Sequence, residues 1–175
     1  ALEATARRLP ALLVGLGAIG QHTAQVAAAL GMRVLGVRRT ASEPFPGIEH
    51  VTGIESLHDL LPEADFVVLM TPLTPATRGL IGERELRLMK RDAYLVNVAR
   101  GGVVDEAALV NALRAGWIAG AGLDVFEHEP LPPNSPLWAM TNVIITGHYA
   151  GVTPAYDVRA FEVFLDNLRR YRAGQ

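Results

Sequence analysis

Three glycines near the start of the chain have the spacing of a loop that binds a nucleotide diphosphate. The segment GLGAIG places Gly15, Gly17 and Gly20 after an apolar run typical of a strand and before a stretch typical of a helix. In that context the first glycine allows a tight turn, the second lets a pyrophosphate approach the backbone, and the third lets helix and strand pack closely. Ala18 and Ile19 would begin the helix, whose N-terminal amides favour a negative charge. A glycine-rich turn that binds no ligand is the alternative.

The second expected strand ends on two arginines, at the place where such domains normally carry an acidic side chain for the adenosine ribose. Arg38 lies eighteen residues beyond Gly20, Arg39 follows it, and residues 36–40 contain no carboxylate. A guanidinium suits a phosphate better than a diol. The pair therefore predicts a preference for the 2′-phosphorylated cofactor NADP(H), with NAD(H) still possible. A solvated arginine pair at a strand end is the alternative.

Composition argues against several other classes of protein. The chain has 175 residues, of which 50% are hydrophobic and 19% charged, and its formal net charge is −2. This length suits one domain with a real core, and the charge balance predicts no nucleic-acid partner. The sequence contains no Cys, and no two of its five histidines have zinc-site spacing beside a third ligand, so we expect no metal site.

One uncharged stretch, residues 10–32, raises the question of a signal peptide or membrane span. Its glycines, with Gln21, His22 and Gln25, interrupt the apolar run every few residues and fit a nucleotide loop better. We therefore expect no membrane partner and a cytoplasmic protein. A reducing compartment agrees with the absence of Cys but does not follow from it.

Apolar runs alternate with amphipathic stretches along the chain, which is typical of a parallel sheet covered by helices on both faces. The sequence thus predicts an α/β fold, a Rossmann-type doubly wound sheet over residues 1–175. The six expected strands cover residues 11–16, 33–38, 65–70, 93–98, 118–125 and 143–146. Helices are expected near residues 18–30, 55–61, 83–89 and 105–115. Asp105 should be an N-cap, and Gly116 should follow a helix C-terminus.

The last element is expected to be an amphipathic helix. Thr153 can cap it, and Pro154 suits its first turn. Its apolar stripe at helical spacing comprises Val158, Phe161, Leu165 and Leu168.

Five motifs follow one another along the chain. They are GLGAIG at 15–20, TPLTPATR at 71–78, VNVARGGVVDE at 96–106, GLDVFEHEPL at 122–131 and TGHYAG at 146–151. In this order they resemble the nucleotide-binding domain of the D-isomer-specific 2-hydroxyacid dehydrogenases, the family that contains glyoxylate/hydroxypyruvate reductases and phosphoglycerate dehydrogenase. The resemblance spans nearly the whole chain, and a chance assembly of five ordered motifs is hard to credit.

The resemblance implies an active site made of Arg100, Glu129 and His148. Reduction of a 2-oxo acid requires hydride at the carbonyl carbon, a proton for the developing alkoxide and a cation for the carboxylate. An imidazolium can give the proton, a carboxylate can orient it and favour its charged form, and a guanidinium can hold the substrate by paired hydrogen bonds. Each residue taken alone could be an ordinary loop side chain. Where relatives commonly have Pro before the histidine, this chain has Gly147, which should leave the histidine loop less restrained.

The same resemblance implies further contacts with the cofactor. Asp124 would contact the nicotinamide carboxamide, although a strand-end carboxylate that turns the chain is the alternative. Val98 and Ala99 would line the pocket of the nicotinamide ring. Pro72 and Thr77 would lie along the adenosine and pyrophosphate.

Family members carry a second domain, built mainly from residues before the glycine loop, that closes over the substrate. This chain has only about ten residues before its first expected strand. We therefore expect a cofactor domain without its substrate-binding domain, which binds NADP(H) but turns over poorly because half of the water-excluding enclosure is absent. The last helix would run toward that absent domain, and a homodimer is the default.

The predicted function is hydride transfer between NADP(H) and a small 2-oxo or 2-hydroxy acid. A nucleotide-sensing or dimerisation module, as in corepressors that resemble this family, is the alternative from another class. Retention of all three catalytic residue types favours the enzyme. A formate dehydrogenase would have Gln in place of Glu129, and a transhydrogenase-like or alanine-dehydrogenase-like domain should lack the last two motifs.

Overall fold

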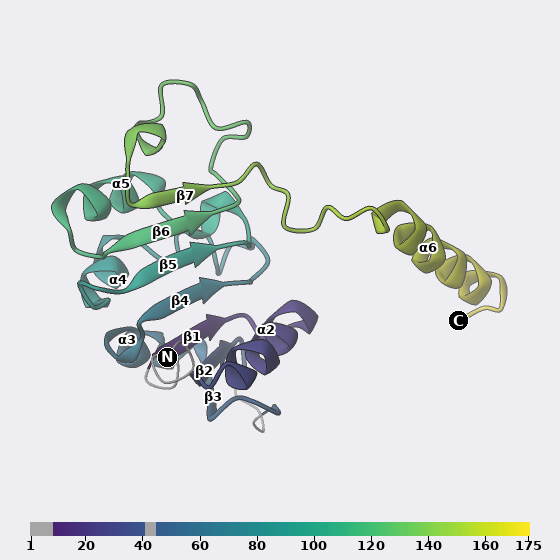
Figure 1. Cartoon of the computed structure of the whole chain (residues 1–175). Coiled ribbons are helices and arrows are strands. Elements are labelled where there is room, and N and C mark those ends of the chain that lie inside the picture. The colour runs from purple at the N-terminus through teal and green to yellow at the C-terminus, as the bar shows by residue number, and fades with distance from the viewer. Residues whose placement is uncertain (1–8, 41–44) are drawn as a thin grey trace.

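The structure is a computed structural model that describes residues 9–40 and 45–175, and its centre is one parallel sheet (Figure 1). The strands lie in the order β3-β2-β1-β4-β5-β6-β7, and every neighbouring pair is parallel. Their bounds are β1 Pro10–Val14, β2 Arg33–Arg38, β3 His50–Gly53, β4 Phe66–Leu69, β5 Tyr94–Asn97, β6 Gly120–Leu123 and β7 Val143–Ile145. Because the chain builds outward from β1 in both directions, this is the expected doubly wound Rossmann-type fold, with its crevice at the carboxyl ends of β1 and β4.

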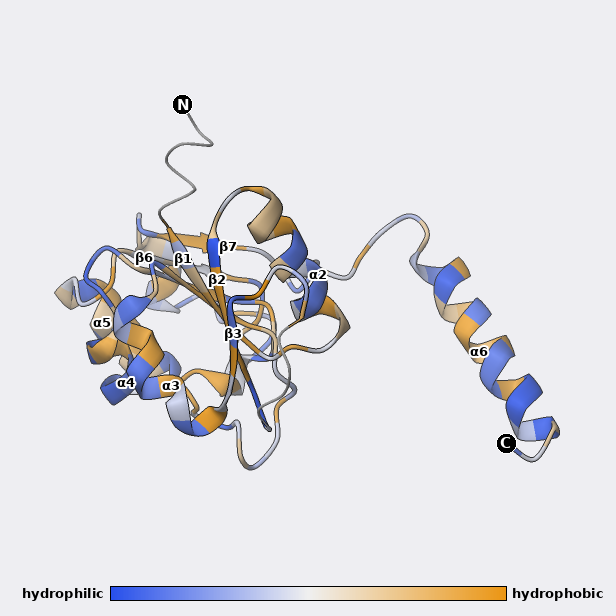
Figure 2. Cartoon of the chain, turned by 90° about the horizontal axis from the view of Figure 1, so that it is seen from below, coloured by the Kyte–Doolittle hydropathy of each residue, from blue (hydrophilic) through white to orange (hydrophobic). Residues whose placement is uncertain are grey.

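Helices cover both faces of the sheet (Figure 2). One face carries α2 (Ala18–Ala29), and the other carries α3 (Leu57–Leu60), α4 (Glu83–Leu88) and α5 (Glu106–Ala115). The described part also contains four short 3-10 turns: η1 Ile54–Ser56, η2 Leu61–Glu63, η3 Gly101–Val103 and η4 Pro136–Ala139. A last helix, α6 (Tyr156–Arg172), follows β7.

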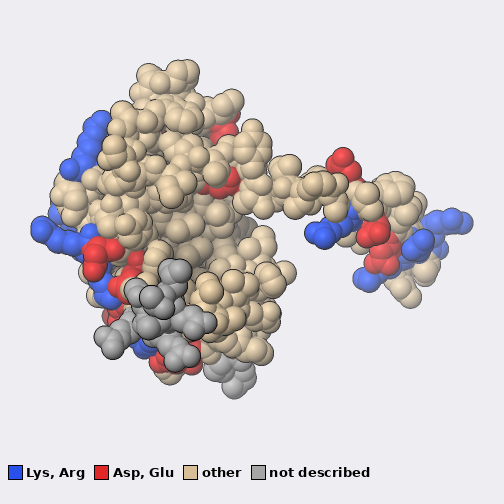
Figure 3. All heavy atoms as spheres, viewed as in Figure 1, with Lys and Arg blue, Asp and Glu red and all other residues tan. Residues whose placement is uncertain are grey.

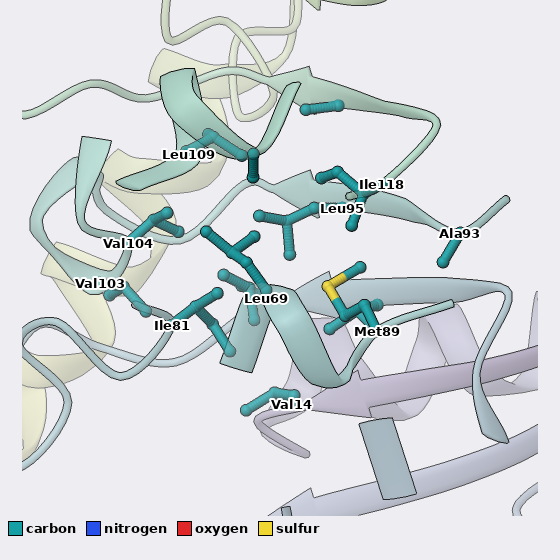
Figure 4. Close-up of a cluster of buried hydrophobic side chains, with 14 of the residues drawn as sticks. Val14, Leu69, Ile81, Met89, Ala93, Leu95, Val103, Val104, Leu109 and Ile118 are labelled. Carbon is teal, nitrogen blue, oxygen red and sulfur yellow. The ribbon is translucent and has the colours of Figure 1, made fainter. Parts of the chain in front are cut away.

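The strands send alternate side chains into two apolar cores. In β1, Leu13 packs with α2 residues such as Ala24, whereas Leu12 and Val14 pack into the larger core on the other face. Figure 4 shows that larger core, in which Val14, Leu69 and Leu95 of the strands belong to one cluster with Leu109 of α5. Burial of β1 on both faces explains why its sequence is a continuous apolar run.

Both caps expected for α5 are present. The Asp105 side chain accepts a hydrogen bond from the Ala108 amide at 2.9 Å, and Gly116 ends the helix with a left-handed φ of 65°. These local signals fix where α5 begins, directly after the segment that carries Arg100.

Three differences from the expected elements lie within the part of the chain that forms the sheet and its covering helices. The edge strand β3 was missed because its half-exposed, partly polar sequence lacks the apolar run of a central strand. The helix expected over 55–61 is η1, α3 and η2 in succession, with Pro62 in the last turn. The strand expected over 118–125 is shorter in the structure, where β6 covers only Gly120–Leu123. Asp124 already lies in the following loop, and its carboxylate accepts a hydrogen bond from Thr146 after β7.

The helix α6 forms, but it stands apart from the sheet and has no buried residue (Figures 1 and 2). Thr153 is not its N-cap. The carbonyl of Thr153 accepts the Tyr156 amide in a turn that precedes the helix, and Ala155 occupies the cap without a side-chain bond. Three residues of the expected stripe, Val158, Phe161 and Leu168, are exposed, and Leu165 is half-buried. Acidic and basic side chains both lie on the surface of the helix (Figure 3).

Candidate active site

Every residue expected in the site lies at or beyond the carboxyl end of a strand. The glycine loop follows β1, Arg38 ends β2, and the remaining site loops follow β4, β5, β6 and β7. Because the strands are parallel, these ends share one edge of the sheet. The topology therefore gathers residues that are far apart in the sequence.

The glycine loop has the geometry of an open anion cradle. Gly15 has a φ of 104°, and its amide donates to the Val37 carbonyl at 2.8 Å. A Cβ on Gly20 would overlap the Gly15 carbonyl oxygen, whereas a Cβ on Gly17 would meet nothing within 4 Å. No side chain caps the start of α2, and Ile19 is 69% exposed there. A diphosphate fits this open helix N-terminus.

A pocket of about 490 Å³ opens beside the glycine loop. Its lining comprises Ile19, Met70, Thr71, Pro72, Leu73, Val98, Ala99 and Arg100. The Thr71 hydroxyl is buried and has no hydrogen-bond partner among the described residues, which is the state expected of a group that a ligand would satisfy. Thr77 does not line this pocket, since its hydroxyl donates to the Pro72 carbonyl at 2.6 Å within the loop.

The two arginines at the end of the second strand lie at the same edge of the sheet. Arg38 is half-buried, with its guanidinium carbon 5.5 Å from the centre of the Phe45 ring, and Arg39 is exposed. The ring contact holds the Arg38 side chain at the end of β2.

Arg100, Glu129 and His148 all line a second pocket, of about 640 Å³. His148 Nδ1 lies 2.8 Å from Glu129 Oε2, and the other Glu129 oxygen accepts the Phe126 amide at 3.0 Å. Arg100 lines both pockets, and one of its nitrogens donates to the Ala99 carbonyl at 2.6 Å. The structure therefore brings the three expected side chains together, with Arg100 shared by the two pockets.

The electrostatics keep Glu129 ionised. Its hydrogen bond with His148 lowers the pKa of the Glu129 carboxyl, and the Phe126 amide and the Arg100 charge act in the same direction. Burial opposes them but does not reverse the shift. An ionised Glu129 holds the proton of the imidazole on Nδ1, the nitrogen that faces it.

Asp124 anchors the loop that carries His148. This carboxylate is only 4% exposed, and it accepts the Thr146 hydroxyl at 2.5 Å and the amides of Tyr149 and Ala150 at 2.9 and 3.0 Å. Burial raises the pKa of Asp124, but these hydrogen bonds outweigh burial and lower it overall. The restraint that a proline before His148 would give is thus provided by a carboxylate from the loop after the neighbouring strand.

The sequence suggested a cofactor contact for Asp124, with a strand-end carboxylate that turns the chain as the alternative, but it did not predict that Asp124 anchors the His148 loop. The signal was present, because a carboxylate directly after a buried strand lies beside the next strand end in a parallel sheet. The contact with the nicotinamide carboxamide stays a prediction.

Two features are absent from residues 9–40 and 45–175. No group of three or more His, Cys, Asp or Glu side chains there could hold a metal ion. None of the helices there has the length and apolar character needed to cross a membrane.

Comparison with known proteins identifies the family. Residues 3–150 match the model of the D-isomer specific 2-hydroxyacid dehydrogenase, NAD binding domain. The chain belongs to this family. Within it, the chain matches the NAD-binding domain.

Curated relatives agree with that assignment. The chain is 46% identical over 166 residues to a glyoxylate reductase of Korarchaeum cryptofilum, with 93% of this chain and 49% of the relative covered. It is 47% identical over 163 residues to a glyoxylate reductase of Thermococcus gammatolerans, with 93% and 48% covered. The chain therefore spans about half the length of the curated relatives that it matches.

Solved structures share the fold. A D-isomer specific 2-hydroxyacid dehydrogenase from Xanthobacter autotrophicus, crystallised with NADPH and MES, has a TM-score of 0.92 at 45% identity, covering 98% of this chain and 69% of that one. An NADPH-dependent glyoxylate/hydroxypyruvate reductase from Sinorhizobium meliloti, in complex with NADP and sulfate, has a TM-score of 0.87 at 34% identity, covering 97% and 54%.

Proposed function

We propose that the chain is the cofactor-binding part of an enzyme that transfers hydride between NADP(H) and a small 2-oxo or 2-hydroxy acid. The observation that carries this proposal is the pocket in which Arg100 and the Glu129–His148 pair meet, next to an open glycine loop. The relatives named glyoxylate reductase support a small 2-oxo acid as the substrate.

The residues at the glycine loop suit a dinucleotide. The first amides of α2 would hold its pyrophosphate, and Val98 and Ala99 would line the pocket of the nicotinamide. Arg38 and Arg39 would hold a 2′-phosphate, and the NADPH-dependent solved neighbour supports that preference. A bound nicotinamide cofactor would supply or accept the hydride.

The residues of the chain itself account for the rest of the chemistry. Arg100 would bind the substrate carboxylate by paired hydrogen bonds and orient the carbonyl group. His148 would give a proton from Nε2 to the carbonyl oxygen during reduction, and would take it back during oxidation. Glu129 would keep the ring in one orientation through Nδ1, so that Nε2 is free to act.

The proposed assembly contains more than this segment. Residues 1–175 would be the dinucleotide-binding domain, and a substrate-binding domain would complete the cleft, which the greater length of the relatives supports. The exposed stripe of α6 would pack against that domain. A homodimer and a cytoplasmic location belong to the same proposal.

The experiment compares the full-length protein with its His148→Ala variant, following NADPH oxidation with glyoxylate or hydroxypyruvate. Loss of the general acid should lower kcat by about 10²- to 10⁴-fold while NADPH affinity is kept. Undiminished turnover in the variant would refute the enzymatic role. Tight NADPH binding without turnover in the unaltered protein would favour the nucleotide-sensing alternative.

A further inference from the structure

Two glutamates that the proposed mechanism does not use bond to each other's backbone. The amide of Glu106 donates to Glu127 Oε1 at 3.2 Å, and the amide of Glu127 donates to Glu106 Oε2 at 3.2 Å. We call this reciprocal pair the Glu106–Glu127 bridge. It joins the first residue of α5 to the loop after β6.

The two segments that the bridge joins carry two of the three catalytic side chains. Arg100 begins the segment that runs through η3 into α5, and Glu129 lies two residues beyond Glu127. Between these segments the backbones touch, because a Cβ on Gly101 would overlap the backbone of Phe126 and Glu127. A shift of the loop after β6 would therefore move Glu129 relative to Arg100.

The bridge also reaches the imidazole through one further residue. Phe126, directly before Glu127, donates its amide to Glu129 Oε1, and the other oxygen of Glu129 faces His148. Phe126 itself is buried, so its backbone is fixed on the side of the core. The bridge fixes the side that faces solvent.

The charges at the bridge are compatible with its geometry. Two neighbouring carboxylates repel each other, but each accepts a backbone amide, and both lie at the N-terminus of α5, where negative charge is favoured. Asp105 caps the Ala108 amide of that helix, and Glu127 accepts the amide one residue after Asp105. The loop after β6 thus contributes a second cap to α5.

We propose that Glu127, with Glu106, is a positioning residue that fixes the Glu129–His148 pair relative to Arg100. The effect on turnover rests on the function proposed above, whereas the effect on the structure does not. Separate experiments therefore measure the effect on the structure and the effect on turnover.

The structural test measures amide hydrogen exchange at Phe126 by NMR in this chain. In Glu127→Ala the exchange should accelerate about tenfold, which is the effect of losing one hydrogen bond of ordinary strength. Glu127→Gln should exchange as the unaltered chain does, because the glutamine oxygen can still accept the Glu106 amide. Glu106→Ala removes the other bond and should accelerate exchange similarly.

The matched control is Glu83→Ala. Glu83 is the first residue of α4, as Glu106 is of α5, but it pairs with Arg87 and lies outside both pockets. This control should leave exchange at Phe126 unchanged. Urea unfolding of each variant establishes that it is folded, and if Glu127→Ala does not fold, Glu106→Ala decides the structural test.

The kinetic test uses the full-length protein. Glu127→Ala should lower kcat about tenfold and leave KM for NADPH unchanged, since the glycine loop is not part of the bridge. Glu127→Gln should stay within about twofold of the unaltered enzyme. Unchanged exchange in both alanine variants, or equal losses in the alanine and glutamine variants, would overturn the proposal. Absence of turnover in the unaltered protein would instead count against the proposed function.

Discussion

The Asp124 carboxylate, just beyond the end of β6, accepts the hydroxyl of Thr146, just beyond the end of β7, at 2.5 Å. The same carboxylate takes two amides from the other side of His148, whose own φ is 63°. A positive φ at a residue other than glycine costs about 1 to 3 kcal/mol, so the hydrogen bonds on both sides must offset that cost. The position of the proposed acid therefore depends on a carboxylate that it does not touch.

The first prediction concerns Asp124→Asn. An asparagine would turn its NH₂ group toward at least one of the donors that the carboxylate now accepts. We expect a loss of about 1 to 3 kcal/mol in the free energy of unfolding, measured in urea, together with a lower kcat in the full-length protein. Asp166→Asn, an exposed change on α6, is the matched control and should be nearly neutral. Equal stability of the two variants would contradict the anchoring role.

The second prediction concerns acid. The pKa values of Asp124 and Glu129 are lowered by folding, so the unfolded chain binds protons more readily than the folded chain does. Their stabilisation is complete above the unfolded value of about 4 and is lost as the pH falls through the lower folded values. Urea unfolding between pH 7 and pH 3 should show this decline. The decline should be smaller in Asp124→Asn, and an equal slope in that variant would refute the contribution of Asp124.

The third prediction separates two glycines of the same loop. Gly20→Ala should cost about 1 to 3 kcal/mol of stability, because its Cβ would overlap the Gly15 carbonyl. Gly17→Ala faces open space and should change stability by less than about 0.5 kcal/mol. It should nevertheless weaken NADPH binding about tenfold or more, since the methyl group would stand where the pyrophosphate approaches. Calorimetric titration and urea unfolding check both variants.

The fourth prediction concerns the choice of cofactor. Arg38→Asp should weaken NADPH binding by about 10- to 100-fold, the cost of losing a charge-assisted contact, and should strengthen NADH binding through the ribose hydroxyls. Arg91→Asp makes the same change of charge at an exposed position outside both pockets, and should leave both affinities unchanged. An unchanged preference in Arg38→Asp would remove the argument for NADP(H).

The sequence predicted well wherever the signal was local. The Asp105 cap and Gly116 were found because each depends on the conformation of a few neighbouring residues. The central strands were found because burial on both faces requires a continuous apolar run. The three residues proposed for catalysis came from motifs in a known order, and the structure places them in one pocket.

What the sequence did not predict depends on contacts between distant segments. Glu106 and Glu127 are 21 residues apart, and neither carries a local signal for bonding to the other. The anchoring by Asp124 required knowledge that β7 lies beside β6. The turn before α6 is closed by a backbone hydrogen bond from the Tyr156 amide to the Thr153 carbonyl. The side chain of Thr153, which suits an N-cap, does not indicate that its backbone forms this turn.

The strand order also separates the residues proposed to select the coenzyme from those proposed for acid–base chemistry. The loops after β1, β2 and β4 would meet the adenosine and pyrophosphate of the dinucleotide. Arg100, Glu129 and His148 come from the loops after β5, β6 and β7, as do the residues expected at the nicotinamide, Val98, Ala99 and Asp124. Selection could therefore retune coenzyme choice and acid–base chemistry through separate sets of mutations. Arg100 lines both pockets, so a substitution there would affect cofactor binding and substrate chemistry together.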